Sequence, residues 1–349
     1  MTPITPELLP DALRACYEAD VPALVHGSPG IGKSDLIHQF AAGTGCDLYD
    51  VRLPLLDPVD FGIPYTHGDG NQRKAGFAVT QSLFPTGERD GKAIVFLDEI
   101  TAAPSAMQVA AYSLVLDRRV REIPLSPGTY VCGAGNLVTD GAVAKRLSTA
   151  LGSRFFHFLL EPDHRAWEAW ACDPDRGNMP IEIIAFLRFK PALFYKYDRD
   201  AVTSDQTFPC PRTWEAVAKV FRTNPPATIA PSLYAAGIGT AAATELSGFL
   251  SVWGSLPNAD AVLQAPDTHP VPDDPAVKFA LAGALAVKVH QANAARFHRF
   301  AERMGGEFEV LASRSAILHN AAQIKAGNGP TGYVQTQAYV DFCRRYSDL

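Results

Sequence analysis

The sequence is poor in the features that mark secreted, membrane-spanning and nucleic-acid-coating proteins. Its 6 cysteines lie far apart and form no C-x-x-C pair, which disfavours both a zinc site and a disulfide framework. It has no apolar run of transmembrane length, and residues 1–7 lack the basic and apolar regions of a secretory signal. A formal charge of -6 disfavours a broad nucleic-acid footprint. We therefore expect a cytoplasmic protein with reduced thiols and no membrane partner.

Apolar residues are plentiful, and their spacing predicts an α/β fold in the first half of the chain. With 349 residues and 47% hydrophobic content, the chain can bury the cores of two or three domains. Short apolar runs predict strands at 22–27, 47–53, 93–97, 129–134 and 155–160. Between them we expect helices at 5–19, 34–42 and 105–117 and a small hairpin at 118–128. Alternating strands and helices predict a parallel sheet with helices on both faces.

Strand signals fade after residue 162, where helical periodicity takes over. We expect helices at 163–172, 180–188, 212–222, 232–253, 275–304, 313–326 and 335–346, and a proline-rich linker at 255–275. The expected domains are therefore 1–161, 162–264 and 265–349. Residues 55–90 are rich in Gly, Asp and Pro with weak periodicity, and so long a connection is typically functional or mobile.

The most specific motif is a phosphate loop that fits G-x-x-x-x-G-K-[ST] without mismatch. Its glycines allow a tight turn whose N–H groups face a phosphate, and a following helix N-terminus favours an anion. Lys33 would add a charge for the β and γ phosphates, and the Ser34 hydroxyl could hold Mg²⁺. An accidental glycine-rich turn is the alternative. The expected nucleotide-binding residues are Gly27, Ser28, Pro29, Gly30, Ile31, Gly32, Lys33 and Ser34.

Two acids end the apolar run that begins at Ile94. In a phosphate-loop enzyme Asp98 would orient the hydration shell of Mg²⁺, so the metal-binding residues would be Ser34 and Asp98. Glu99 is placed to polarise a water for attack on the γ-phosphate. The alternative is that both are solvated acids at a strand end.

Three further polar residues have weaker signals taken alone. Asn136 follows the expected strand 129–134, where an amide could bond the γ-phosphate or the attacking water, although turn asparagines are common. Arg154 precedes the last strand, and Arg212 begins a helix beside a proline; both positions also suit a solvated charge.

Taken together, the segments GSPGIGKS, IVFLDE, GN at 135–136, SRF at 153–155 and PRTWE at 211–215 resemble AAA+ ATPases. Residues 53–62 and 161–163 make the chain similar to the MoxR-type branch. The resemblance, over about residues 5–260, implies an AAA+ phosphate-loop parallel sheet with helices on both faces and a small α-helical lid. The helices expected after residue 264 would form a further helical C-terminal region.

The resemblance also implies roles for the polar residues. Asp98 and Glu99 would be the metal-orienting and catalytic acids, and Asn136 a polar sensor. Arg154 would be the arginine finger reaching a neighbouring subunit's nucleotide, with Arg146 as the competing candidate, and Arg212 would reach the nucleotide from the lid.

The implied activity is ATP hydrolysis with ATP and Mg²⁺ as cofactors, in a homo-oligomer that is a hexameric ring. A finger acting in trans needs a head-to-tail contact, which closes into a ring when the rotation allows. The branch implies chaperone-like remodelling of protein complexes or metal-cofactor insertion beside a partner with a von Willebrand A domain. The alternative is a nucleic-acid motor or clamp-loader-like AAA+ ATPase, since AAA+ relatives move DNA. Three arginines beside the hairpin could line a pore for DNA: Arg118, Arg119 and Arg121. A nucleotide-binding scaffold without turnover is a third possibility.

Overall fold

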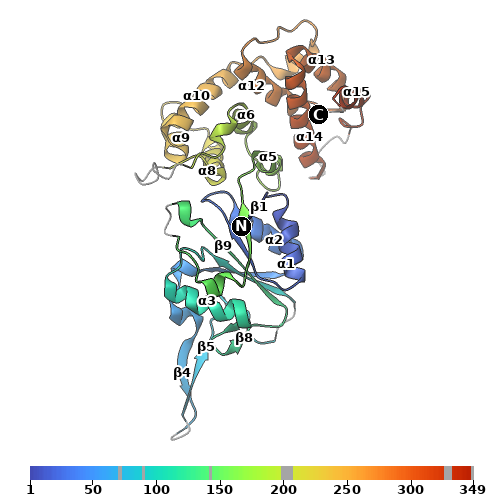
Figure 1. Cartoon of the computed structure of the whole chain (residues 1–349). Coiled ribbons are helices and arrows are strands. Elements are labelled where there is room, and N and C mark those ends of the chain that lie inside the picture. The colour runs from blue at the N-terminus through green and yellow to red at the C-terminus, as the bar shows by residue number, and fades with distance from the viewer. Residues whose placement is uncertain (70–72, 89–90, 141–143, 198–206, 326–331, 347–349) are drawn as a thin grey trace. The chain divides into compact units, whose positions relative to one another are not determined.

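In the computed structural model the chain forms two compact units, Met1–Asp163 and His164–Leu349. The structure describes all residues except 70–72, 89–90, 141–143, 198–206, 326–331 and 347–349. The first unit combines strands and helices, and the second is helical (Figure 1). The finer division into 1–161, 162–264 and 265–349 stays a prediction.

The first unit contains the strands and helices that the apolar pattern predicts, with some displaced ends. Its strands are β1 (Thr2–Ile4), β2 (Ala23–His26), β3 (Asp47–Arg52), β4 (Ile63–His67), β5 (Lys74–Ala78), β6 (Ala93–Asp98), β7 (Arg119–Val120), β8 (Ile123–Pro124), β9 (Thr129–Gly135) and β10 (Phe156–Leu160). Its α-helices are α1 (Leu9–Glu18), α2 (Lys33–Thr44), α3 (Ser105–Asp117) and α4 (Thr149–Gly152).

Two helix ends were predicted wrongly. The helix expected from residue 5 begins at Leu9. The helix α2 continues through Gly43 and is followed by Gly45, whose φ of 68° suits glycine. The hairpin expected at 118–128 is confirmed as the antiparallel pair β7–β8.

Six parallel strands form the central sheet in the order β1-β10-β2-β9-β6-β3. The edge strand β1 was not predicted, because three residues carry too little periodicity to signal a strand. The strand β2, which precedes the phosphate loop, lies inside the sheet between β10 and β9. Loops that follow β2, β9 and β6 therefore emerge side by side at one edge.

Helices cover both faces of this sheet, as predicted (Figure 1). On one face Leu24, Val95 and Val131 share a hydrophobic core with α3. On the other face the Tyr130 ring meets Tyr17 of α1, and the Phe96 ring meets His38 of α2. Alternate residues of a strand point to opposite faces, so runs of apolar residues fill both cores.

The long connection 55–90 is more ordered than its composition predicts. It contains an antiparallel hairpin, β4–β5, which projects away from the sheet and whose residues are mostly exposed (Figure 1). Beyond the hairpin, Phe84 is fully buried and its ring lies 4.9 Å from that of Phe61. The N–H of Ser126 also donates to the Pro85 carbonyl. The residues around Phe84 therefore belong to the hydrophobic core of the first unit.

The second unit is built from helices. They are α5 (His164–Cys172), α6 (Ile181–Phe189), α8 (Pro211–Arg222), α9 (Ala230–Ile238), α10 (Thr240–Gly254), α11 (Ala259–Gln264), α12 (Pro275–Ala286), α13 (Ala294–Met304), α14 (Gly306–Lys325) and α15 (Gln337–Arg345). Among the helices that the structure describes, none is both long and apolar enough to span a bilayer.

Four predictions for this unit were wrong in detail. The helix expected at 232–253 is broken at Gly239, whose φ of 80° lies outside the helical region. The helix expected at 275–304 is two helices, α12 and α13, and the expected linker 255–275 contains α11. Finally, α14 begins at Gly306, seven residues before the expected start at 313.

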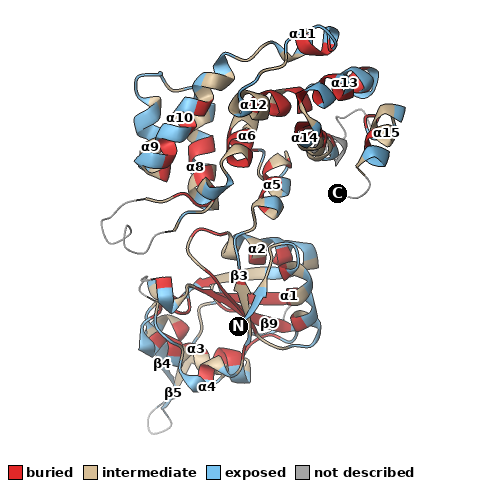
Figure 2. Cartoon of the chain, turned by 45° about the horizontal axis from the view of Figure 1, so that its top comes forward, coloured by how far each residue is buried: buried red, intermediate tan, exposed pale blue. Residues whose placement is uncertain are grey.

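Two hydrophobic clusters fill the second unit, and α12 contributes to both. Ala280 belongs to the cluster around Trp214 and Phe186, whereas Leu281 and Leu285 belong to the cluster around Phe297. Figure 2 shows buried residues concentrated along α6 and α12. Because one helix supplies both cores, the two clusters are joined through shared backbone.

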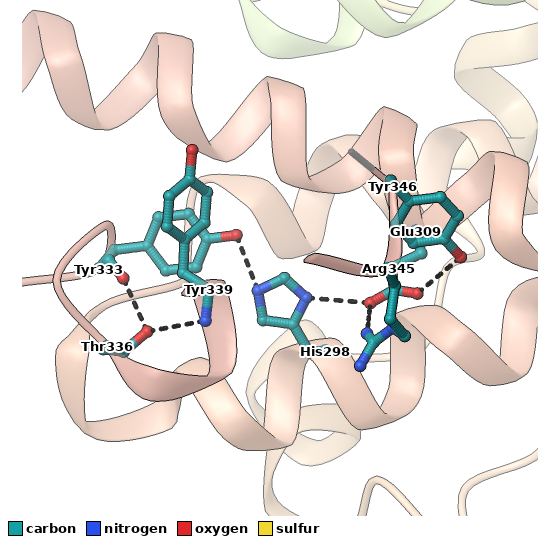
Figure 3. A network of polar contacts seen from close by, with 7 residues as sticks. All are labelled: His298, Glu309, Tyr333, Thr336, Tyr339, Arg345 and Tyr346. Carbon is teal, nitrogen blue, oxygen red and sulfur yellow. Dashed lines mark hydrogen bonds and ion pairs between the residues drawn. The ribbon is translucent and has the colours of Figure 1, made fainter. Parts of the chain in front are cut away.

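A buried polar network fixes the last helix to the second cluster (Figure 3). The Glu309 carboxylate is fully buried and accepts hydrogen bonds from Arg345 and from the Tyr346 hydroxyl, the latter at 3.0 Å. His298 Nδ1 lies 3.1 Å from the same carboxylate, and its Nε2 lies 3.2 Å from the Tyr333 hydroxyl. Burial raises the pKa of Glu309, but the His298, Tyr346 and Arg345 contacts outweigh it and leave the pKa lowered. His298 thus links Glu309 of α14 to Tyr333 through its two ring nitrogens.

Candidate functional site

The expected nucleotide-binding residues gather at one edge of the sheet. Parallel strands present their carboxyl ends together, and open α/β sheets bind ligands in the crevice at that edge. His26 at the end of β2 pairs with Gly135 of β9, and Leu97 of β6 pairs with Gly133. The loop after β2, the acids that end β6 and the turn after β9 therefore lie next to one another.

The loop 27–34 adopts a backbone that its glycines make accessible. Gly30 and Gly32 have φ values of 76° and 93°, in the region that favours glycine. At Gly27 a Cβ atom would lie 2.6 Å from Ile31 Cδ1 and 2.8 Å from the Leu160 carbonyl, so no larger residue fits. Lys33 begins α2, and this helix N-terminus faces the loop.

Lys33 joins the loop to the adjacent strand. Its Nζ donates to the carbonyls of Gly27 and Ser28, at 2.8 and 2.9 Å, and to Asn136 Oδ1 at 2.9 Å. An ammonium has three rotatable donors, so it can exchange a carbonyl for a phosphate oxygen without losing all its contacts. The structure thus brings together Lys33 and Asn136, which are 103 residues apart in the sequence.

Ser34 and Asp98 make a second contact across the same edge. The Ser34 hydroxyl donates to Asp98 Oδ2 at 3.0 Å, and the Glu99 N–H donates to Asp98 Oδ1 at 2.9 Å. Asp98 is only 7% exposed, so its carboxylate is held in place from both sides. A hydroxyl and a carboxylate are the oxygen donors that Mg²⁺ accepts, and such sites typically take one or two protein ligands beside phosphate oxygens. The residues present therefore fit the metal that the motif implies.

Glu99 is exposed and has a φ of 53°, an uncommon conformation for a non-glycine residue. Hydrogen bonds hold the backbone in this conformation: the Glu99 N–H donates to the Asp98 carboxylate, and the Ile100 N–H donates to the Ala134 carbonyl. Backbone strain that the surroundings maintain is typical of functional positions. An exposed carboxylate beside a buried, anchored one is an arrangement that can accept a proton from water.

Thr101 is a part of the site that the sequence did not reveal. Its hydroxyl donates to the Asn136 carbonyl at 3.1 Å and its carbonyl accepts from the Lys145 N–H. A Cβ at Gly135 would lie 2.6 Å from Thr101 Cγ2, so the glycine permits this approach. No local pattern signals the role, because it arises only when β6 and β9 pair.

Arg154 lies at the opposite edge of the sheet, in the turn between α4 and β10. Its Nη1 donates to the Ala150 carbonyl at 2.9 Å, and its guanidinium lies 5.5 Å from the centre of the Tyr112 ring. Since β10 runs parallel to β2, a residue before β10 is at the amino edge, away from the loop at the carboxyl end of β2. The competing Arg146 is exposed and follows Lys145, whose N–H bonds Thr101.

Arg212 belongs to the second unit, as the second residue of α8, and its side chain is exposed. Pro211 occupies the first helical turn as expected, and the Cys210 N–H donates to Thr213 Oγ1 at 2.9 Å. The contact expected between Arg212 and the nucleotide stays a prediction.

Comparison with solved structures returns likenesses of low identity and low TM-score. No protein-family model matches the sequence. A RuvB variant from Thermotoga maritima is 17% identical, with a TM-score of 0.34 over 97% of this chain and 86% of that chain. The Thermotoga maritima RuvB Holliday junction branch migration motor is 16% identical, with a TM-score of 0.31 over 97% of this chain and 85% of that one. A candidate ATPase from Cytophaga hutchinsonii is 12% identical, with a TM-score of 0.33 over 89% and 80%.

The fold class predicted from the sequence is confirmed by the structure itself. A six-stranded parallel sheet carries a phosphate loop and helices on both faces, and a helical region follows it. The site is a lysine and a serine on that loop facing a buried aspartate, an exposed glutamate and an asparagine.

Proposed function

We propose that the protein is an AAA+ ATPase that hydrolyses ATP with Mg²⁺ at the carboxyl edge of its sheet. The observation that carries the proposal is the convergence of the loop with two neighbouring strands. Lys33 Nζ lies 2.9 Å from Asn136 Oδ1, and Ser34 Oγ lies 3.0 Å from Asp98 Oδ2. A bound magnesium nucleotide supplies the phosphoryl group whose charge these residues would stabilise.

Each residue has a distinct part in this proposal. The loop N–H groups and Lys33 bind the phosphates, while Ser34 and Asp98 hold and orient the metal. Glu99 accepts the proton of the attacking water, and Asn136 orients that water or the γ-phosphate. Arg154 stabilises developing charge in a neighbouring subunit, since its own loop lies at the other edge of the sheet, and Arg212 contacts the nucleotide from the helical unit.

We further propose that the chain forms a homo-oligomeric ring, a hexamer, of the MoxR-type branch. In this proposal it remodels protein complexes or assists metal-cofactor insertion beside a partner with a von Willebrand A domain, in the cytoplasm. The sequence resemblance supports this part, and the projecting hairpin β4–β5 offers an exposed surface for such a partner.

The alternative, a nucleic-acid motor, rests on the arginines at the β7–β8 hairpin. Arg118 pairs with Asp20 at 2.8 Å, Arg119 donates to the Glu122 carbonyl, and Arg121 donates to the Pro58 carbonyl. These contacts within the chain favour a structural role for the three arginines over a phosphate-binding one.

A turnover assay on the wild type and on Glu99→Gln tests the proposal. We expect ATP binding by both proteins and phosphate release by the wild type alone. Wild-type protein that binds ATP without releasing phosphate would instead support a scaffold. Binding to DNA that weakens steeply with salt would support the nucleic-acid alternative.

A further inference from the structure

A pair of histidines connects the two edges of the sheet on which the proposed mechanism depends. His26 ends β2, directly before the phosphate loop, and His157 lies on β10, three residues after Arg154. His26 Nε2 lies 2.8 Å from His157 Nδ1, and the rings are stacked with their centres 5.1 Å apart. His157 Nε2 lies 2.7 Å from the Gly152 carbonyl, in the turn that carries Arg154.

The strand register explains why these two side chains meet. His157 pairs with Leu24 in the parallel ladder, and His26 is two residues beyond Leu24. Side chains two apart on a strand point to the same face, so both histidines lie on the face that α3 covers. The pair therefore extends diagonally from the carboxyl end of β2 toward the amino end of β10.

The last acceptor of this chain fixes the direction of one of its two hydrogen bonds. A carbonyl oxygen can only accept, so His157 Nε2–H donates to Gly152. His26 Nε2 and His157 Nδ1 share the other bond, whose donor depends on the tautomers of the two rings. Burial above all, together with the Lys33 charge, lowers the pKa of His26 to about 4, which favours its neutral form. The result is an unbroken chain of two hydrogen bonds from His26 through His157 to Gly152.

The turn at the end of this chain lies between two buried residues, Leu151 and Phe155, and the Gly152 carbonyl also accepts the Phe155 N–H. The helix α4 spans only Thr149–Gly152, and the Ser148 hydroxyl accepts the Leu151 N–H at its start. Arg154 itself is held by the Ala150 carbonyl and the Ser153 hydroxyl of the same turn. A displacement of Gly152 would therefore move the residues that hold the guanidinium.

We propose that His26 and His157 are positioning residues that couple the phosphate loop of a subunit to the turn with which it presents Arg154 to its neighbour. A shift of the loop on nucleotide binding moves His26, and the two hydrogen bonds carry that shift to Gly152. The inference rests on the proposed function, because it requires Arg154 to act on a neighbouring subunit's nucleotide.

Two amide substitutions of His157 separate its two hydrogen bonds. The amide of His157→Gln reaches the place of Nε2 and can donate to Gly152, whereas that of His157→Asn reaches only the place of Nδ1. A misplacement of about 1 Å can cost about 100-fold in rate, so we expect His157→Asn to lower kcat by about 10- to 100-fold. His157→Gln keeps the Gly152 bond but loses the bond to His26, so we expect it to lower kcat to a similar extent, and KM to change less than kcat in both variants. His38→Gln, on the opposite face of the sheet, is the matched control.

Oligomers mixed from two variants test whether His157 acts through Arg154 on the neighbouring subunit. His157→Asn subunits keep an intact ATP site, and Glu99→Gln subunits bind ATP without hydrolysing it and keep Arg154 coupled to their own loop. Mixing the two in one ring should restore turnover at interfaces where the intact loop faces the intact finger. No recovery in rings shown to contain both subunits would overturn the proposal, because His157 would then be acting on its own loop.

A double-mutant cycle tests whether the two histidines form one chain. His26→Phe keeps a ring of similar shape without the hydrogen bond. If the chain acts as a unit, the double variant His26→Phe/His157→Asn should lose no more turnover than one single variant. The inference would be contradicted if the losses of turnover of the two single variants multiplied in the double variant, or if His157→Asn kept wild-type turnover. Should Arg154→Ala retain wild-type turnover, the proposed finger and the inference fall together; should it be inactive while His157→Asn is active, only the inference falls.

Discussion

The sharpest test of the site compares its two adjacent acids, because the structure places them in opposite environments. Asp98 is 7% exposed and both of its carboxylate oxygens accept hydrogen bonds, from Ser34 and from the Glu99 N–H. Glu99 is exposed. The substitutions Asp98→Asn and Glu99→Gln make the same chemical change, and we expect them to have different effects on stability.

At Glu99 the substitution should lower turnover and leave the free energy of unfolding almost unchanged. A substitution at an exposed side chain changes the free energy of unfolding by about 0.5 kcal/mol or less. General acid–base catalysis contributes about 10²–10⁴ in rate, which corresponds to about 3–5 kcal/mol of activation free energy. We therefore expect Glu99→Gln to bind ATP with unchanged affinity and to lose at least about 100-fold in kcat.

At Asp98 the same change should also lower stability. An asparagine can keep its oxygen on the Glu99 N–H and donate its NH₂ group to the Ser34 oxygen, so both bonds persist but become neutral. Hydrogen bonds to charged groups contribute about 1.5–3 kcal/mol against about 0.5–1.5 kcal/mol for neutral ones, so we expect a cost of about 1–2 kcal/mol. Urea unfolding of both variants, beside phosphate release and calorimetric ATP titration, measures the difference. Equal stability loss in the two variants, or wild-type turnover in Glu99→Gln, would refute the reasoning.

Changes at the loop, at the turn before β10 and in the long connection should each have a separate effect. Lys33→Ala should abolish tight ATP binding in a calorimetric titration, since the loop loses its point charge; unchanged affinity would argue against the site. Arg154→Ala should bind ATP as an isolated subunit but not hydrolyse it, and mixing with Lys33→Ala should restore part of the turnover; a lack of recovery in mixed rings would favour Arg146 or action in cis. Replacing residues 64–77 by a short Gly-Ser linker should keep basal turnover within about tenfold, because loop closure costs little. Phe84→Ala, by contrast, should cost about 3–5 kcal/mol of stability in urea unfolding, since the ring is fully buried; a cost below about 1 kcal/mol would exclude this segment from the core.

The sequence by itself determined the phosphate loop and the strand that ends in Asp98. Both are contiguous segments whose chemistry depends on residue type and local backbone, and the loop needs glycine at φ values of 76° and 93°. The continuous apolar runs likewise predicted the strands of a parallel sheet buried on both faces, which the structure confirms. Short or polar elements carry too weak a pattern to be predicted in this way, as the edge strand β1 and the hairpin β4–β5 show.

The tertiary structure decided which residues meet. Ser34 contacts Asp98 across 64 residues of sequence, Lys33 contacts Asn136 across 103, and His26 contacts His157 across 131. Such contacts depend on strand order and register, which no local spacing specifies. The sheet places β9 and β10 on either side of β2, and that arrangement sets the asparagine against the loop, the histidines against each other and Arg154 at the opposite edge.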